Sequence, residues 1–367
     1  MRFLVAAAAL VLAAPATLGG AAPAYTDSVC RTVRVAWAND PCAGSQWGLS
    51  TIKVPQAWRL SRGARVVVAV VDTGADFRHP DLRGRLLARR GSNLLKNTAA
   101  RCPFQPAQAG ARRSRAIAQD DNGHGTHVAG TIAAATGNRA GVAGVAPAAR
   151  VLPVKVLDRN GSGTDRDVAR GICFAVRQGA KVVNLSLGND PLTSIVIAGS
   201  GSDTNRAVSY AYARGAAVII AAGNESFPAC DFPAAHAKAL CVGAVDRRGL
   251  KASYSNFGVA IGVVAPGGAG GVSCDDDDDI WSTILPAHRA QPCRRGGYET
   301  LAGTSMATPH VSGIAALVIA RFGRRRATPK FVEDRLRSTA DDLGIPGVDL
   351  LYGYGRVNAQ RAVSSGS

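Results

Sequence analysis

The chain has 367 residues, of which 47% are hydrophobic and 19% are charged, so its length suits one large domain or two ordinary ones. Its formal net charge is +17 and its pI is near 10.1. The basic residues are mostly scattered single arginines, and no zinc finger, RNA-binding aromatic signature or basic zipper helix accompanies them. We therefore expect loose attraction to anionic polymers, and no nucleic-acid partner.

The N-terminus has the pattern of a secretory signal. Arg2 precedes an apolar run at residues 3–18, and small residues follow at 22–24. No later segment offers the roughly twenty apolar residues of a membrane span. We expect a signal peptide at residues 1–24, a short arm at 25–43, one catalytic domain at 44–367, and a secreted, extracellular protein. The arm is too short to bury a core, so we also expect folding without an attached chaperone domain.

Eight cysteines follow the expected cleavage point. An even number in an exported chain predicts disulfide bonds, although eight cysteines allow about 105 pairings. We expect the local pairs Cys30–Cys42, Cys230–Cys241 and Cys274–Cys293, which leave Cys102 for Cys173.

Apolar runs of strand length alternate with helix-length segments along the domain. Strands are predicted at residues 66–71, 151–156, 182–185, 218–221 and 240–244, and helices at 126–135, 165–178 and 203–214. Such β-branched strands are typical of a parallel sheet buried on both faces. We therefore predict a three-layer α/β/α domain with a mainly parallel central sheet.

Two segments have the character of insertions. Residues 89–119 are polar and Arg-rich, and residues 267–279 run from glycines into five aspartates at 275–279. A run of carboxylates is usually a solvated loop. A calcium site and a contact for basic peptides are the alternatives.

Three stretches contain candidate catalytic residues. Asp72 ends the first buried strand, where ligands of open α/β sheets gather, and His124 stands between two glycines at a helix start. Ser305 lies in Gly-Thr-Ser-Met-Ala-Thr-Pro-His at residues 303–310, before an apolar helical segment, and Pro309 falls close to the expected helix start. Each residue alone has a structural interpretation, which for Ser305 is that of an N-cap. Together, on one α/β scaffold, they indicate a catalytic site.

Residues 69–74, 122–130 and 303–310 resemble the motifs of the subtilisin-like serine proteases, and the resemblance extends from about Gln46 to the C-terminus. It implies that Ser305 attacks the peptide carbonyl, His124 takes its proton and Asp72 orients the imidazole. It also implies that Asn224, within residues 221–224, stabilises the oxyanion together with the Ser305 N–H.

The resemblance further implies how substrate and calcium bind. Substrate would lie as an added strand along two segments, and the pocket for the residue before the cut would have small walls that favour a large apolar side chain, although Asn189 stands where relatives commonly carry glycine. The substrate-binding residues are then Gly161, Ser162, Gly163, Ser186, Leu187, Gly188, Ala222 and Gly223. A structural calcium ion would take side-chain oxygens of Asp81 and Asn138 and carbonyls of Thr136, Ala140 and Val142, whereas catalysis needs no cofactor.

The leading hypothesis is a secreted, monomeric serine endopeptidase that cleaves proteins or peptides through an acyl-enzyme, broadly and with a preference for large apolar residues. One alternative is a processing protease dedicated to a specific substrate, which basic residues in that substrate would favour. Another is a catalytically silent binding relative, against which the intact catalytic residues argue. An α/β esterase does not fit, because residues 303–307 are not a Gly-x-Ser-x-Gly elbow.

Overall fold

A computed structural model describes residues 2–4, 34–188, 202–271, 278–286 and 296–365. Its centre is a seven-stranded sheet in the order β3-β4-β2-β6-β7-β8-β9, and every neighbouring pair is parallel. The strands are β2 (Val67–Asp72), β3 (Ser92–Asn93), β4 (Arg150–Lys155), β6 (Val182–Leu185), β7 (Ala217–Ala221), β8 (Leu240–Val245) and β9 (Ile261–Pro266).

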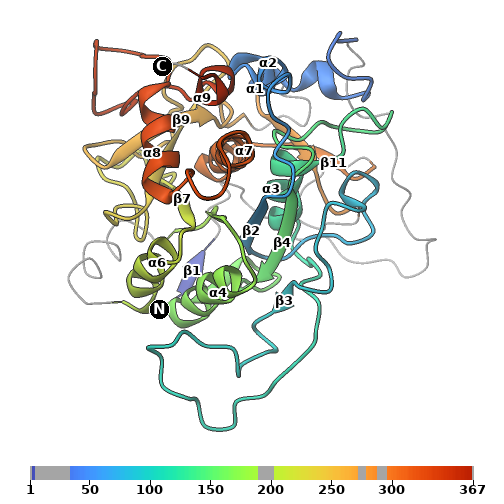
Figure 1. Ribbon diagram of the computed structural model, residues 1–367, viewed down its shortest axis with the longest axis vertical. Helices are drawn as coiled ribbons and strands as arrows, with labels where there is room; N and C mark the ends of the chain where they lie inside the picture. The colour runs from blue at the N-terminus through green and yellow to red at the C-terminus, as the bar shows by residue number, and fades with distance from the viewer. Residues whose placement is uncertain (1, 5–33, 189–201, 272–277, 287–295, 366–367) are drawn as a thin grey trace.

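Helices cover both faces of this sheet (Figure 1). Along β2, Val68 and Val70 belong to the core beneath α3 (His124–Ala133) and α7 (Thr304–Phe322). Ala69 and Val71 belong to the core beneath α4 (Asp165–Arg177) and α6 (Asp203–Ala213). Because both faces are buried, the strand is apolar at every position before Asp72. The predicted three-layer α/β/α fold is confirmed.

Smaller elements surround these layers. The antiparallel pairs are β10 (Ile280–Thr283) with β11 (Tyr298–Leu301), and β1 (Arg2–Leu4) with β5 (Ser162–Thr164). The remaining helices are η1 (Ala43–Ser45), α1 (Trp47–Thr51), α2 (Val54–Ala57), η2 (Pro80–Leu82), α8 (Pro329–Ser338) and α9 (Ala359–Val363). The predicted strand at residues 182–185 matches β6, whereas α3 begins two residues before the predicted start at 126.

The sequence predicted that Pro309 lies close to the start of its helix, and this prediction is wrong. α7 already begins at Thr304, and Pro309 lies inside it. A proline in a helix interior cannot donate to the carbonyl four residues earlier, here that of Ser305. The Ser186 hydroxyl donates to this carbonyl instead, at 2.8 Å, so the helix tolerates the proline.

The inserted segment at residues 89–119 is fastened to α4. The predicted disulfide Cys102–Cys173 joins the two, with 5.4 Å between the Cα atoms. The buried Arg170 guanidinium donates to the backbone carbonyls of Leu94, Asn97 and Ala100 in the inserted segment. This contact explains how a mostly exposed, polar loop is held against the domain.

The other cysteine predictions fall partly outside the described residues. The predicted Cys230–Cys241 disulfide is present, and Cys42 is also disulfide-bonded. Cys30, Cys274 and Cys293 lie outside the described ranges, as do residues 275–277 of the aspartate run. Asp279, at the end of that run, is buried and accepts a hydrogen bond from the Gly270 N–H, so it is not part of a solvated loop.

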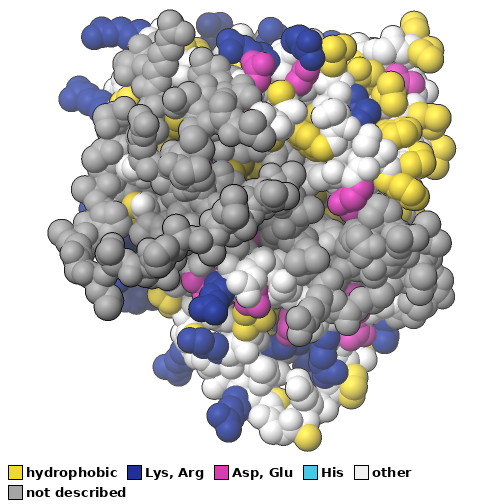
Figure 2. Space-filling view, turned by 180° about the vertical axis from the view of Figure 1, so that it is seen from behind, with side chains coloured by type: hydrophobic (Ala, Val, Ile, Leu, Met, Phe, Trp, Pro, Cys, Tyr) yellow, Lys and Arg dark blue, Asp and Glu magenta, His cyan; other side chains and the backbone are white. Residues whose placement is uncertain are grey.

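Among the described side chains of the surface seen from behind, Lys and Arg lie at scattered places (Figure 2). This distribution agrees with the scattered arginines of the sequence. Among the described helices, none combines the length and apolar character that crossing a bilayer requires.

Candidate active site

The carboxyl end of β2 meets the start of α3. Asp72 is the last residue of β2 and is fully buried, and His124 is the first residue of α3. The His124 Nδ1 lies 2.9 and 3.0 Å from the two Asp72 carboxylate oxygens. The Thr73 N–H also donates to Asp72 Oδ1, at 2.7 Å. The carboxylate is therefore held in position and fixes the orientation of the imidazole.

The close approach of α3 to the end of β2 requires a glycine at position 125. A Cβ on Gly125 would lie 2.2 Å from the Gly74 carbonyl oxygen, so no other residue fits where α3 begins against the end of β2. The Gly125 N–H donates to Thr73 Oγ1 at 2.9 Å. The glycine that follows His124 in the sequence is thus required for steric reasons.

Asp120 fixes the start of α3, a role that sequence reasoning missed. Its Oδ1 accepts from the N–H groups of Asn122 and Gly123, and its Oδ2 accepts from the N–H and the hydroxyl of Thr126. Burial opposes ionisation, but these hydrogen bonds prevail and lower the pKa of Asp120 below its usual value. The only signal in the sequence was its position just before the histidine motif.

Lys155 was also missed. It ends β4, is buried, and its Nζ donates to the carbonyls of Thr73 and Leu157 and to Asp121 Oδ1, at 2.7–2.8 Å. The ammonium group therefore joins the segments that follow β2 and β4. The sequence feature that could have indicated this role is the position of a lysine at the end of a largely apolar strand.

Ser305 is the second residue of α7 and is 5% exposed. It is not the N-cap, because Gly303 occupies that position. Its hydroxyl donates to the Ser186 carbonyl at 3.2 Å. Within the described residues, the buried His124 Nε2 has no hydrogen-bond partner, so this structure does not join Ser305 to His124 by a hydrogen bond. Catalytic hydrogen bonds of this kind often form only when substrate is present.

Asn224 is tied to the start of α7. Its Oδ1 accepts from the N–H and the hydroxyl of Thr304, each at 2.9 Å. Because these donors need an acceptor, they fix which side of the amide is oxygen. The amide NH₂ therefore points away from Thr304. The first N–H groups of α7, including that of Ser305, have no partner within the helix.

The predicted substrate-binding residues lie at the carboxyl edge of the sheet or on β5. Ser186 and Leu187 are buried in this structure, and the Ser186 carbonyl accepts a hydrogen bond from the Ser305 hydroxyl. On β5, the antiparallel partner is a segment of this chain itself, with Phe3 opposite Gly163. The remaining predicted residues are Gly161 and Ser162 at β5, Gly188 after β6, and Ala222 and Gly223 after β7.

The predicted calcium loop folds around two buried carboxylates. Asp81 accepts from the Asn138 amide at 2.7 Å and from the Val142 N–H at 2.9 Å, and burial raises the pKa of Asp81 to about 7. Asp40, which sequence reasoning missed, accepts from the N–H groups of Gly137 and Asn138. Among the described residues, no group of three or more His, Cys, Asp or Glu side chains is placed to hold a metal.

Two further histidines are structural. His127 Nε2 lies 3.0 Å from the Ile280 carbonyl, and burial, assisted by the nearby His124, lowers the pKa of His127 to about 3. His310 Nδ1 lies 2.9 Å from the Met306 carbonyl, and burial lowers its pKa to about 4. Both are therefore neutral at physiological pH.

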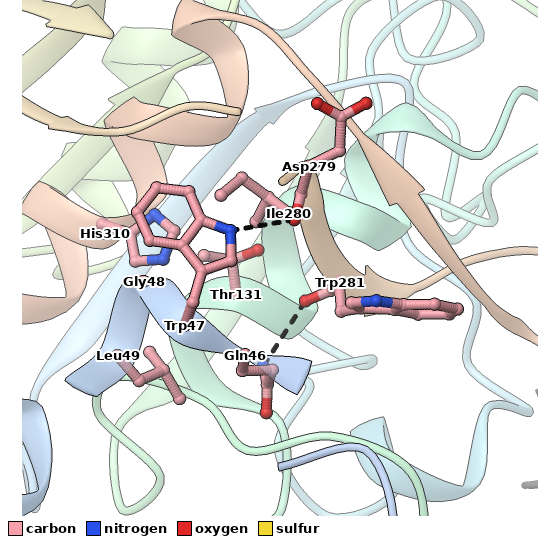
Figure 3. A pocket seen from close by; sticks show the side chains of 9 residues that line it. All are labelled: Gln46, Trp47, Gly48, Leu49, Thr131, Asp279, Ile280, Trp281 and His310. Carbon is pink, nitrogen blue, oxygen red and sulfur yellow. Dashed lines mark hydrogen bonds between the residues drawn. The ribbon is translucent and has the colours of Figure 1, made fainter. Parts of the chain in front are cut away.

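A small cavity lies between α1 and β10, beside His310 (Figure 3). Trp47 Nε1 donates to the Asp279 carbonyl across it, and the space inside is about 10 Å³. Such a volume holds no more than about one water molecule. The cavity is therefore not a substrate site.

An aspartate–histidine pair at the carboxyl edge of a parallel sheet, together with a serine at a helix start, offers the residue types that serine hydrolases use for catalysis. The comparisons with known proteins specify the family. The family model of the "Subtilase family" matches residues 63–355. The chain belongs to this family and is a serine endopeptidase.

Relatives along nearly the whole chain agree with this assignment. Thermitase of Thermoactinomyces vulgaris is 38% identical, over 89% of this chain and 98% of its own. Subtilisin Savinase of Lederbergia lenta is 38% identical, over 86% and 97%. A solved structure of proteases from Pseudoalteromonas arctica aligns with a TM-score of 0.74 at 34% identity, over 89% of this chain and 99% of that one.

Proposed function

We propose that the enzyme cleaves peptide bonds by nucleophilic attack of Ser305. His124 accepts the Ser305 proton and passes it to the leaving amine, while Asp72 holds the imidazole and stabilises its charged form. The acyl-enzyme is then hydrolysed by water that His124 activates. The observation that carries this proposal is the bifurcated hydrogen bond from His124 Nδ1 to the two oxygens of the buried Asp72 carboxylate.

The developing oxyanion is stabilised by Asn224 and the Ser305 N–H. Thr304 holds the oxygen side of the Asn224 amide, so the nitrogen side is oriented before substrate arrives. A donor fixed in advance is worth more than one that must reorient during the reaction. The helix dipole of α7 adds positive potential at the same place.

Substrate binds as an extended strand along β5, between that strand and the segment that follows β6. The antiparallel pairing of residues 2–4 with β5 supports this mode, since an extended segment of this chain lies along the same edge. The residue before the cut enters between residues 186–188 and 221–223. Small residues in these walls leave room for a large side chain, and binding through the backbone favours a broad range of proteins.

A role as a processing protease for a specific substrate is a second candidate, because the Asp231 carboxylate lies beside Gly188 and Gly223. A silent binding role is disfavoured, since all four proposed catalytic residues are present and Asp72 contacts His124. We further propose that the enzyme is exported, that it acts as a monomer, and that calcium stabilises it.

The calcium ligands proposed from the sequence fit the ion in their donor chemistry. Asp81 supplies a buried carboxylate, and an amide rotation would turn the Asn138 oxygen toward it. Asp40, from the N-terminal arm, places a second carboxylate against the same loop. The ion would stabilise the loop and take no part in the chemical step.

The test is to secrete the wild-type enzyme and Ser305→Ala, label both with a serine-directed phosphonate and assay them on casein. We expect labelling and cleavage in the wild type alone, with the label on Ser305. A folded wild-type enzyme that neither labels nor cleaves casein overturns the proposed triad.

A further inference from the structure

We propose that Lys155 is a positioning residue that holds the segments carrying Asp72 and His124 together before substrate binds. This inference deepens the proposed function and rests on it, because it concerns the pair of residues that the proposed mechanism uses. Among the described residues, the Lys155 ammonium group makes no hydrogen bond with either catalytic side chain. It instead connects the segment that follows Asp72 with the segment that precedes His124.

Lys155 lies beside Asp72 in the central sheet. β2 and β4 are neighbouring parallel strands, and Asp72 and Lys155 are register partners. Such partners present their side chains to the same face of a sheet, which here is the face of Val70 beneath α3. The N–H groups of Val156 and Leu157 donate to the Asp72 carbonyl at 2.9 and 3.2 Å. The end of β4 therefore holds the backbone of Asp72 and also places a buried ammonium group beside it, since Lys155 is 2% exposed.

Every donor of this ammonium group has a partner. Nζ donates to the carbonyls of Thr73 and Leu157 at 2.8 and 2.7 Å, and to Asp121 Oδ1 at 2.7 Å. An ammonium group has three donors and no acceptor, so each donor is used once. Because the three partners lie in three different segments, one buried charge fixes the distances between them. A side chain without donors, such as that of methionine, would leave both buried carbonyls without this hydrogen bond.

Thr73 links the ammonium group to the catalytic aspartate. It is fully buried, and its N–H donates to Asp72 Oδ1 at 2.7 Å. Its Oγ1 accepts from the N–H of Gly125, the residue after His124, at 2.9 Å. Its carbonyl accepts from Lys155. A single residue therefore contacts the carboxylate, the helix start that carries the histidine, and the ammonium group.

Asp121 links the ammonium group to the histidine. It lies three positions before His124 in a segment that is tied to itself. The His124 N–H donates to Asn122 Oδ1 at 3.1 Å, and the Asn122 N–H donates to Asp120 Oδ1 at 2.9 Å. Lys155 holds this segment through the Asp121 side chain, which is 55% exposed. This hydrogen bond can therefore be removed by mutation without opening the core.

The experiment measures kcat and KM of Lys155→Met on a peptide amide. Rates are divided by the concentration of active enzyme, titrated to completion with the serine-directed phosphonate, so that a smaller folded fraction does not count as a slower reaction. We expect kcat to fall by about tenfold or more and KM to stay within about threefold, because small displacements of catalytic groups mainly affect the chemical step. An unchanged kcat in the folded variant overturns the inference.

A double variant separates positioning from general structural damage. If Lys155 acts through the Asp72–His124 pair, its removal should cost little once Asp72 is gone. We expect Lys155→Met to lower the residual kcat of Asp72→Ala by less than about threefold, against about tenfold or more in the wild-type background. Equal losses in the two backgrounds would overturn the positioning role, since a merely structural lysine would affect both alike.

Asp121→Ala tests the same role from the surface, and it decides the matter if Lys155→Met fails to fold. We expect kcat to fall by about threefold or more with KM unchanged, and a smaller loss overturns the inference. Asp334→Ala is the matched control, because Asp334 is 52% exposed and also accepts from a lysine, Lys330, at 2.7 Å. It should leave kcat unchanged.

Casein cleavage and phosphonate labelling of the wild-type enzyme are measured in parallel. A wild-type enzyme that labels and cleaves casein, with variants that keep its kcat, overturns only the role of Lys155. A folded wild-type enzyme that does neither overturns the proposed function itself.

Discussion

Ser186 and Ser305 exchange hydrogen bonds in both directions. The Ser186 hydroxyl donates to the Ser305 carbonyl at 2.8 Å, and the Ser305 hydroxyl donates to the Ser186 carbonyl at 3.2 Å. The first bond replaces the one that Pro309 cannot make inside α7. Asn184 in turn donates to Ser186, and Ser312 donates to Asn184, all in the buried interior. The end of β6 and the nucleophile are therefore one connected unit.

Ser186→Ala should destabilise the protein, because it leaves the Ser305 carbonyl buried without its donor. A cost of about 1–3 kcal/mol is expected from the unsatisfied group, measured by urea unfolding in a Ser305→Ala background that prevents self-digestion. Adding Pro309→Ala should recover part of the loss, since the new N–H can donate to the same carbonyl. A double variant no more stable than Ser186→Ala would show that this bond does not compensate for the proline.

Asn224→Ala should lower kcat with little change in KM, because the proposed donor acts on the oxyanion and not on the bound substrate. Losses of about 100- to 1,000-fold are typical for removal of one such donor in enzymes of this kind. Steady-state kinetics on a peptide amide would measure it. Thr304→Val is the control, since it removes one of the two bonds that orient the amide, and it should cost less. A kcat within about threefold of the wild type in Asn224→Ala would remove Asn224 from the mechanism.

Stability should fall on the acid side of pH 6.5. The folded pKa values of His127 and His310 are about 3 and about 4, below the ordinary value of 6.5. Their contribution to stability is therefore complete above pH 6.5 and is lost as the pH falls through the folded pKa values. His310 alone should account for a loss on the order of 3 kcal/mol between pH 6.5 and 4.

The test is to compare the pH dependence of unfolding in Ser305→Ala with and without His310→Asn. The asparagine keeps a donor for the Met306 carbonyl but does not titrate in this range. We expect a shallower acid slope in the double variant. Identical slopes would mean that protonation of other groups causes the loss.

Calcium should raise the thermal midpoint of the Ser305→Ala protein relative to the same protein in a chelator. The stabilisation expected from one site is about 2.7 kcal/mol when free calcium is 100 times its Kd. Asp81→Asn should abolish the difference, because it removes the buried carboxylate of the loop. Magnesium is the control ion, since it binds reluctantly in sites made of protein oxygens. Equal midpoints with calcium and with chelator would refute the site.

The strands and catalytic residues that are marked by a pattern of neighbouring residues could be predicted from the sequence. Continuous β-branched runs predicted five of the parallel strands within one or two residues, and glycine-framed motifs located Asp72, His124 and Ser305. The exchange between Ser186 and Ser305 could not be predicted, because the two residues are 119 positions apart. Lys155 was missed for the same reason, because its partners Thr73 and Asp121 lie in other segments. Asp120 was missed although its partners Asn122, Gly123 and Thr126 are close in sequence, because nothing in the pattern marks its carboxylate as buried.

The fastening of the inserted segment to α4 has a consequence for the lifetime of the enzyme. A protease that reads extended backbone is surrounded by copies of itself, and a long exposed loop is the easiest part of a neighbour to cut. Cys102–Cys173 and the Arg170 contacts hold residues 94–102 of this segment to α4, which shortens the stretch that can detach and extend into the active site of another molecule. We therefore expect the covalent link to slow self-digestion, so that a concentrated preparation stays active longer than one whose disulfide is removed.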